Sequence, residues 1–334
     1  MRLSLDRVLA ARNTITGIAD HTPLVPSPHM AALTGHDFQL KLEIAQPVGA
    51  FKLRGAVNAI FNLDGAPKGV TCVSTGNHGR GVAYAAHVRG IPAVVCMSRL
   101  APEAKVAGVR ALGAKAHIIG NSQDEAQSEA DRLVAEEGLI EISPFDDPFV
   151  VAGQGTIGLE LLEARPDLET ILVPLSGGGL AGGIAFAAKT IKPSIRVIGV
   201  SMDRGAAMYA SLAAGKPVEV TEVPSLADSL GGGIGLTNRL SFPLCRDYLD
   251  DVILVTEEEI YRALQTIYYE DRIVCEGASV VGSAAVQAGK VRVNGPTATI
   301  ITGRNLDMRL HADIMQGRDV AMGDYTVKGH AYAP

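Results

Sequence analysis

The chain has 334 residues, of which 47% are hydrophobic, 20% are charged and 37 are glycine, and its formal net charge is -6 at pH 7. This composition is typical of a folded globular protein of about two domains and differs from that of disordered chains. The acidic balance argues against a nucleic-acid partner, and no run of about 18 uncharged apolar residues predicts a membrane span.

The first 19 residues predict an amphipathic helix with Ser4 as its N-cap, and they lack the uninterrupted apolar centre of a signal peptide. Four cysteines are scattered along the chain without the spacing of a zinc site or a disulfide framework. Three of them lie in apolar runs, which predicts buried free thiols. We therefore expect a cytoplasmic protein.

Residues 21–24 are expected to be extended, and the alternation of residues 38–43 predicts a half-exposed strand. Lys52 opens a predicted helix that continues to residue 61. From residue 69 onward, strands and helices alternate with short joins, which predicts a parallel sheet covered on both faces. The expected strands are residues 70–74, 92–97 and 116–119, and the expected helices are residues 77–88, 101–112 and 123–137.

A Pro- and Asp-rich segment at residues 144–148 predicts a crossing to a second set of alternations. The expected strands there are residues 170–175, 196–200, 251–256 and 297–302, and the expected helices are residues 180–191 and 257–269, with an irregular Gly-rich segment at residues 226–236. The weakly patterned tail is either a surface strap or a partly ordered end. We thus predict an α/β fold with two doubly wound parallel-sheet domains: a large one (1–69 plus 146–316), a small one (70–145) and a C-terminal tail (317–334).

The stretch QPVGAFKLRG, residues 46–55, places Lys52 between Phe51 and Leu53 just after a Pro/Gly turn. Lysine is the side chain that forms an imine with an aldehyde. It does so at neutral pH only where burial or a nearby cation lowers its pKa. The alternative is an ordinary surface lysine.

Two further turns follow expected strands and precede expected helices, which is where α/β sheets place ligands. The turn SGGGL, residues 176–180, offers backbone N–H groups to an oxyanion, or else needs glycine only for packing. The turn STGNHG, residues 74–79, suits a carboxylate and places Asn77 to donate to a phenolate, or else is an N-capping turn. Thr302 ends the last strand, and residues 231–233 are either another anion cradle or a mobile loop.

In their order along the chain, the stretches FKLRGA (51–56), STGNHG (74–79), AGQGT (152–156) and GGG (177–179) resemble the fold-type II pyridoxal-phosphate enzymes of the threonine/serine dehydratase and serine racemase branch. The resemblance runs from residues 21–24 to residues 302–305, which is most of the chain. Within the branch, PVGAFK and TGRN are most similar to the hydroxyectoine-utilisation dehydratases.

The resemblance implies that pyridoxal 5'-phosphate binds through an imine to Lys52, which also moves the α-proton of the substrate. It implies that Phe51 packs beside the cofactor ring, that Asn77 bonds the ring 3'-oxygen and that Thr302 faces the pyridine nitrogen. The residues implied for the phosphate are Ser176, Gly177, Gly178, Gly179 and Leu180. Those implied for the substrate carboxylate are Ser74, Thr75, Gly76 and His78.

The activity implied is that of a lyase, a dehydratase that removes water from a β-hydroxy amino acid such as threonine, serine or 3-hydroxyaspartate and releases a keto acid and ammonia. A homodimer is also implied. The alternatives are a dehydratase of hydroxyectoine or an opened derivative, in ectoine degradation, and an amino-acid racemase, in which Thr75 would be the second acid/base. An alternative of another class is a non-covalent small-molecule-binding α/β protein.

Several positions depart from the family pattern. Residues 48–52 read VGAFK where Thr-Gly-Ser-Phe-Lys is usual, so two hydroxyls beside the lysine are lost. Metal-dependent members have Glu and Asp where this chain has Ser201 and Ala207, so we predict no divalent metal there. Arg80 either contacts a second acidic group on the substrate, as in hydroxyaspartate, or faces solvent.

Overall fold

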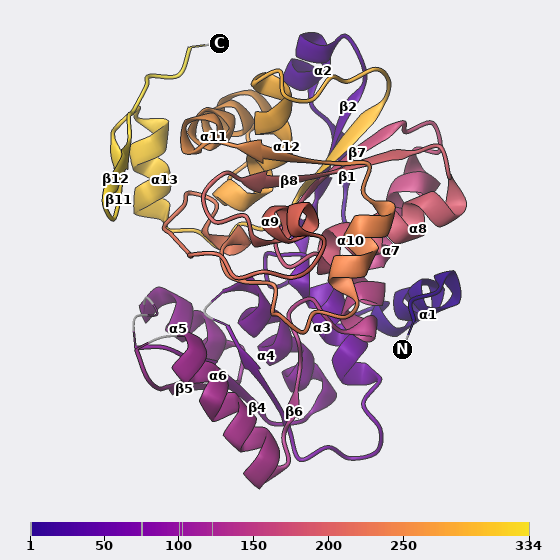
Figure 1. Cartoon of the computed structure of the whole chain (residues 1–334), viewed down its shortest axis with the longest axis vertical. Helices are drawn as coiled ribbons and strands as arrows, with labels where there is room; N and C mark the ends of the chain where they lie inside the picture. Colours follow the sequence, from indigo (N-terminus) through magenta and orange to yellow (C-terminus); the bar gives the residue numbers. More distant parts are fainter. Residues whose placement is uncertain (1, 75, 100, 102, 122, 334) are drawn as a thin grey trace.

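The computed structural model describes residues 2–74, 76–99, 101, 103–121 and 123–333. Its strands form two separate sheets and a small hairpin (Figure 1). The larger sheet has the order β1-β2-β10-β7-β8-β9, and the smaller one has the order β5-β4-β3-β6. Within these two sheets every pairing is parallel except that of β1 with β2. The expected pattern of alternating strands and helices thus builds two parallel sheets.

The strands of the larger sheet are β1 (Leu24–Pro26), β2 (Phe38–Leu42), β7 (Thr170–Pro174), β8 (Arg196–Met202), β9 (Asp251–Val255) and β10 (Thr297–Ile301). Those of the smaller sheet and the hairpin are β3 (Val70–Val73), β4 (Ala93–Met97), β5 (Lys115–Ile118), β6 (Ile140–Glu141), β11 (Val320–Met322) and β12 (Tyr325–Val327). The helices that precede β7 are α1 (Leu5–Ile15), α2 (Pro28–Thr34), α3 (Lys52–Phe61), α4 (Asn77–Arg89), α5 (Glu103–Ala111), α6 (Gln123–Arg132) and α7 (Pro148–Ala164). The later helices are α8 (Gly179–Ile191), α9 (Ala207–Ala214), α10 (Ser241–Tyr248), α11 (Glu257–Asp271), α12 (Gly277–Gln287) and α13 (Met308–Met315). None of the described helices has both the length and the apolar character needed to cross a membrane.

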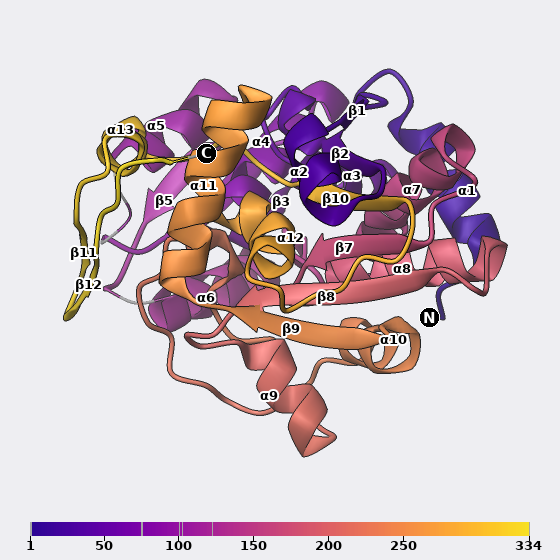
Figure 2. The same cartoon turned by 90° about the horizontal axis from the view of Figure 1, so that it is seen from above.

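Helices cover both faces of the larger sheet (Figure 2). Leu172 and Ile198 point to one face, where they share a core with α12 and, behind it, α11. Ile171 and Val173 point to the other face and pack against α7 and α8. Because neighbouring residues of a strand alternate between faces, these near-continuous apolar runs are what a sheet buried on both sides requires.

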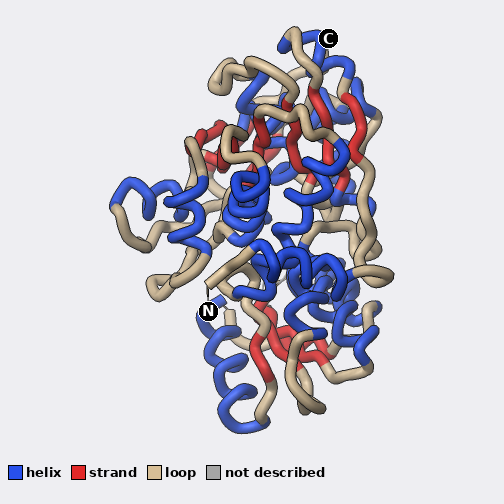
Figure 3. Tube along the Cα trace, turned by 90° about the vertical axis from the view of Figure 1, so that its right-hand side faces the viewer, coloured by secondary structure: helices blue, strands red, loops and turns tan. Residues whose placement is uncertain are grey.

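The smaller sheet is also covered on both faces, and Figure 3 shows its strands as a group apart from those of the larger sheet. Helices α3, α4 and α5 share one core with β3 and β4, whereas α6 packs on the opposite face around Cys96. All four strands of this sheet lie within residues 70–145, the predicted small domain. Helix α3 precedes that range, yet its apolar side chains belong to the core of the small sheet.

Strand β2 differs from the half-exposed strand that its alternation predicts. Gln39 is 9% exposed and Lys41 is 1% exposed, so both faces of the strand are buried. The reason is that Lys41 forms an ion pair with Glu160 of α7. A charge that is neutralised inside the protein leaves the same alternation in the sequence as a charge that faces water.

The tail is the surface strap of the two alternatives, and it includes the hairpin of β11 and β12. The Tyr261 hydroxyl donates to the carbonyls of Ile314 and Arg318 at 3.1 and 2.9 Å. The Gln265 amide donates to the carbonyl of His330 at 2.8 Å. These contacts with α11 hold the tail against the larger sheet's outer helix.

Candidate active site

A cavity of about 920 Å³ lies where the carboxyl ends of β3 and β7 and the end of β10 meet. Its lining includes Ser74 from the small sheet and Gly177 and Thr302 from the large one. The carboxyl ends of parallel strands are where α/β proteins place their ligands, because the following turns leave backbone groups free there.

Lys52 is the first residue of α3 and lines this cavity. Its Nζ donates to the carbonyl of Pro144 at 2.6 Å and lies 5.4 Å from the centre of the Phe51 ring. Burial lowers the pKa of Lys52 to about 8, because the low dielectric disfavours the ammonium form. A sizeable fraction of the side chain is therefore a neutral amine near pH 8, which is the form that attacks an aldehyde.

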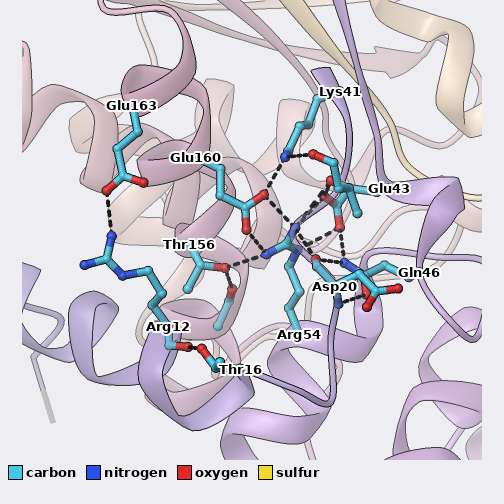
Figure 4. A network of polar contacts seen from close by, with 12 residues as sticks. Arg12, Thr16, Asp20, Lys41, Glu43, Gln46, Arg54, Thr156, Glu160 and Glu163 are labelled. Atoms are coloured by element: carbon cyan, nitrogen blue, oxygen red, sulfur yellow. Dashed lines mark hydrogen bonds and ion pairs between the residues drawn. The ribbon is translucent and has the colours of Figure 1, made fainter. Parts of the chain in front are cut away.

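A network of charged side chains around Arg54, two residues after Lys52, fixes the start of α3 (Figure 4). Arg54 donates to both oxygens of Glu43, at 2.8 and 2.9 Å, and to both oxygens of Glu160, at 2.6 and 2.9 Å. Lys41 also pairs with Glu160, so two cations face two carboxylates. Burial alone would lower the pKa of Arg54, but Glu43 and Glu160 raise it above its ordinary value. Arg54 thus stays charged and ties α3 to β2 and α7.

The glycine turn after β7 has a backbone that admits no side chains. Gly178 has φ +87, which favours glycine, and a Cβ on Gly179 would lie 2.8 Å from the backbone of Phe145. The Ser241 hydroxyl donates to the carbonyl of Gly177 at 2.7 Å. In a trans peptide the N–H of Gly178 points opposite to the carbonyl of Gly177, so this N–H is directed away from α10. Together with the N-terminus of α8, this makes a cradle for an anion.

Asn77 opens α4 and joins the two halves of the cavity wall. Its Nδ2 donates to the oxygens of Glu276 at 2.8 and 3.2 Å. Its Oδ1 accepts from Nδ2 of Asn305 at 2.7 Å. Asn77 belongs to a helix that packs on the small sheet. On the side of the large sheet, Asn305 follows β10 and Glu276 directly precedes α12.

His78 follows Asn77 in α4, and its Nε2 lies 2.8 Å from the carbonyl of Ile142. Burial and the nearby charge of Lys52 lower the pKa of His78 to about 3. The ring is therefore neutral, and the contact with a carbonyl requires that Nε2 carry the proton. Nδ1 is then an acceptor, and it is buried without a partner among the described residues.

Thr302 directly follows β10 and is 2% exposed. Its hydroxyl lies 3.1 Å from the hydroxyl of Ser279, which among the described residues is the only side-chain oxygen within hydrogen-bond distance of it. The carbonyl of Thr302 accepts from the N–H of Phe51 at 3.0 Å, so the strand end is tied to the residue before Lys52. A neutral hydroxyl therefore faces the cavity from this strand.

The structure brings most of the predicted site residues together around this cavity. Those that line it are Phe51, Lys52, Ser74, Gly76, Asn77, His78, Ser176, Gly177, Gly178, Gly179, Leu180 and Thr302. Thr75 lies outside the described residues. Arg80 does not line the cavity; its guanidinium lies against Gly108 of α5, where a Cβ would overlap it. This position favours the alternative in which Arg80 has no contact with substrate, and its role stays a prediction.

Several residues of the site were not predicted from the sequence. Glu276 is buried in the cavity wall, and Asn305 and Ser279 hold Asn77 and Thr302. Asp146 accepts from the N–H groups of Arg239, Leu240 and Ser241, which fixes the start of α10 under the glycine turn. A usable signal was the acidic pair at 146–147 directly before Pro148, because carboxylates in such turns commonly cap helices.

A buried lysine with a lowered pKa, an amide donor and a glycine cradle, all at the carboxyl ends of parallel strands, define a site for a phosphorylated aldehyde. Residues 15–303 match the family model described as "Pyridoxal-phosphate dependent enzyme". The chain belongs to this family, and it is therefore a pyridoxal-phosphate-dependent enzyme.

Relatives and solved structures agree with this assignment. The chain is 52% identical to a "Putative threonine dehydratase" of Sinorhizobium fredii, over 94% of this chain and 96% of the relative. It is 40% identical to an "L-threonine ammonia-lyase" of Thermotoga maritima, over 92% of this chain and 77% of the relative. The structure of maize serine racemase aligns with a TM-score of 0.88 and 35% identity, covering 92% of this chain and 95% of that one. The predicted family, fold-type II architecture and cofactor are confirmed.

The residues present fit pyridoxal 5'-phosphate. A Cβ on Gly177 or Gly179 would fill the turn against Phe145, so the glycines keep the cradle open. Lys52 has the lowered pKa that imine formation requires. Among the described residues, the buried Nδ1 of His78 has no hydrogen-bond partner, so it can accept a hydrogen bond from a bound molecule. Lys52, the glycine turn, Asn77 and Thr302 would hold the aldehyde carbon, the phosphate, the ring oxygen and the ring nitrogen.

Proposed function

We propose that the protein removes water from a β-hydroxy amino acid and releases a keto acid and ammonium. The α C–H and β C–OH bonds break in the elimination, and water then replaces the amino group, so the net products are the keto acid and ammonium. The observation that carries the proposal is the lowered pKa of Lys52, at about 8, in a cavity whose lining also includes Thr302, a residue with a neutral hydroxyl. The threonine dehydratase relatives support the same reaction.

When bound, pyridoxal 5'-phosphate supplies an electron sink for the charge left when the α-proton departs. The protein's part begins with Lys52, whose neutral Nζ is the base for that proton. Ser74, Gly76 and His78 line the cavity at the start of α4, where the free N–H groups of a first helical turn can orient the substrate carboxylate. A hydroxyl such as that of Thr302 cannot stabilise a protonated ring nitrogen as a carboxylate would. This favours expulsion of a β-hydroxyl over a long-lived carbanion.

The test is the visible absorption spectrum of the purified protein, before and after addition of L-threonine, L-serine, threo-3-hydroxyaspartate or hydroxyectoine, with keto acid assayed in parallel. We expect a Schiff-base band that shifts with one compound as keto acid accumulates. Lys52→Ala should abolish both. Lys105→Ala is the matched control, because Lys105 also lines the cavity but is engaged with Asp228 at 3.0 Å. A band that persists in Lys52→Ala, or no keto acid from any compound, would overturn the proposal.

Racemisation is the second candidate, and the likeness to maize serine racemase is the observation that favours it. The same incubations distinguish the two reactions, because a racemase accumulates the D-enantiomer and a dehydratase accumulates keto acid. Chiral chromatography of the L-serine incubation measures the first product directly. D-serine in excess over pyruvate would make racemisation the main activity.

We further propose that the enzyme is a cytoplasmic homodimer and that hydroxyectoine or an opened derivative is among its candidate substrates. Four free, buried thiols support a reducing compartment. The dimer is supported only by the family resemblance. Light scattering after size-exclusion chromatography tests it, since a mass of one 34.9 kDa chain would contradict it.

A further inference from the structure

Three polar side chains form a relay across the cavity wall, from the backbone of Val48 to the carboxyl of Glu276. Nδ2 of Asn305 donates to the carbonyl of Val48 at 2.9 Å and to Oδ1 of Asn77 at 2.7 Å. Nδ2 of Asn77 then donates to Glu276. The relay joins the first residue of α4, on the small sheet, to two residues of the larger sheet's side of the cavity.

The direction of this relay follows from its ends. A backbone carbonyl can only accept, so the amide of Asn305 must turn its nitrogen toward Val48. Both of its N–H groups are then used, one on Val48 and one on Asn77. Asn77 must in turn present its oxygen to Asn305 and its nitrogen to Glu276. The two oxygens of Glu276 lie on one side of Nδ2 of Asn77, at 2.8 and 3.2 Å, so one N–H directed between them serves both contacts. The other N–H is left for the cavity that Asn77 lines.

Glu276 is built into this position. It is 3% exposed and lies just before α12, and its own N–H donates to the carbonyl of Gly303 at 3.0 Å. A Cβ on Gly303 would lie 2.5 Å from Oε1 of Glu276, so glycine at 303 leaves room for the carboxyl. Nothing in the dehydration reaction described above uses this carboxyl, although it lines the cavity.

We propose that Glu276 is a positioning residue, which holds Asn77 with one N–H directed into the cofactor cavity and binds α4 of the small sheet to the large-sheet side. The inference deepens the proposed function, since it concerns the same site. It rests on the cofactor cavity and not on the identity of the substrate. Glu276 therefore acts through Asn77 and not on the reacting atoms.

The charge state of Glu276 bears on this contact. Burial and the nearby Asp228 raise the pKa of Glu276 to about 7, while Asn77, Ser229 and Lys105 oppose the shift. An ionised carboxylate offers only acceptors to Asn77, whereas the protonated acid has one oxygen that donates. The geometry at Asn77 should therefore respond to pH near neutrality.

The test compares Glu276→Ala, Glu276→Gln and the control Glu257→Gln in binding of pyridoxal 5'-phosphate to the apoenzyme, without substrate. Glu257 is a matched control because it is 2% exposed, has a pKa raised chiefly by burial and does not line the cavity. Glu276→Ala should lower affinity about tenfold or more, as expected for a lost hydrogen bond to a charged group. Glu276→Gln still accepts from Asn77 and should restore affinity to within about threefold of the wild type.

The second readout is a pH titration of the visible band of the holoenzyme. A transition with its midpoint near 7 should occur in the wild type and Glu257→Gln and be absent in Glu276→Gln. Wild-type affinity in Glu276→Ala, or an unchanged titration in Glu276→Gln, would overturn the proposal. If Glu276→Ala fails to fold, the titration of Glu276→Gln still decides. A wrong assignment of the dehydration reaction would leave both readouts untouched, because neither contains substrate.

Discussion

Replacing Arg54 with methionine would leave one buried negative charge without a partner. The guanidinium is 1% exposed and donates to both oxygens of Glu43 and of Glu160. Without it, Lys41 alone faces two carboxylates. Removing one member of a buried ion pair costs about 3–5 kcal/mol, because the charge left behind stays desolvated. Set against a typical free energy of unfolding of about 5–15 kcal/mol, the loss is a large part of the total.

Urea unfolding followed by circular dichroism measures this loss as a lower midpoint. Arg165→Met is the matched control, because Arg165 also bridges two carboxylates, Asp37 and Asp167, but at the surface, where ion pairs contribute little. The double variant Arg54→Met with Glu43→Gln removes the unpaired charge and should regain at least half of the lost free energy. Equal losses in Arg54→Met and Arg165→Met, or no recovery in the double variant, would refute the reasoning.

Three further predictions concern the site and the thiols. Only the neutral amine attacks an aldehyde, and the pKa of Lys52 is about 8. Incorporation of pyridoxal 5'-phosphate into the apoenzyme, followed by stopped-flow absorbance, should therefore accelerate as the pH rises through 8. A rate that does not change with pH would contradict the lowered pKa of Lys52. Gly179→Ala puts a Cβ 2.8 Å from the Phe145 backbone and should cost about 1–3 kcal/mol in a thermal melt and weaken cofactor binding, whereas an unchanged melt would show that the turn can yield. The cysteines are all buried: Cys72, Cys96, Cys245 and Cys275. A thiol reagent should therefore label none of them quickly in the native protein and all of them in guanidinium, and rapid labelling of the native protein would disprove this.

The parts of the fold that the sequence predicts are those where one face of an element differs from the other. Local signals at the ends of helices are also informative, as in α11. Its first turn is acidic, and one of these acids, Glu259, forms a capping box with Thr256. Ser4 caps α1, as predicted. The helix ends at Ile15 and not at residue 19, because Gly17, with φ +81, turns the chain before that residue. The expected helix at residues 123–137 ends where predicted, because Gly138 follows it in the left-handed conformation that favours glycine.

Helices α7 and α12 escaped prediction because they have no polar face. Every residue from Val150 to Leu162 and from Gly277 to Val286 is buried. A helix that is covered all round shows no period of 3.6 residues, so its pattern indicates burial and not helix. The same covering explains why Glu160 of α7 gives no sign in the sequence that it faces Lys41 and Arg54.

The placement of the site residues around one cavity was predictable where a motif sets the backbone, as at Lys52, Asn77 and the glycine turn. Glu276 was not, because a lone acid before an apolar helix also fits the simple preference of helix N-termini for negative charge. Only the fold shows that this carboxyl turns inward to Asn77 instead of capping α12. Contacts between residues some 200 positions apart, such as Asn77 and Glu276, leave no local pattern.

The position of β10 between β2 and β7 has a consequence for the order of events during synthesis. The strands of the small sheet lie within residues 70–141, so they are complete before β7 of the large sheet is synthesised. The large sheet must wait for residues 297–301, because β10, which lies inside it, is the last of its six strands along the chain. At about 5–20 residues per second this delay is on the order of ten seconds. During it, the edges of β2 and β7 that β10 will occupy have no partner strand, so this is the stage at which pairing with another chain competes with folding.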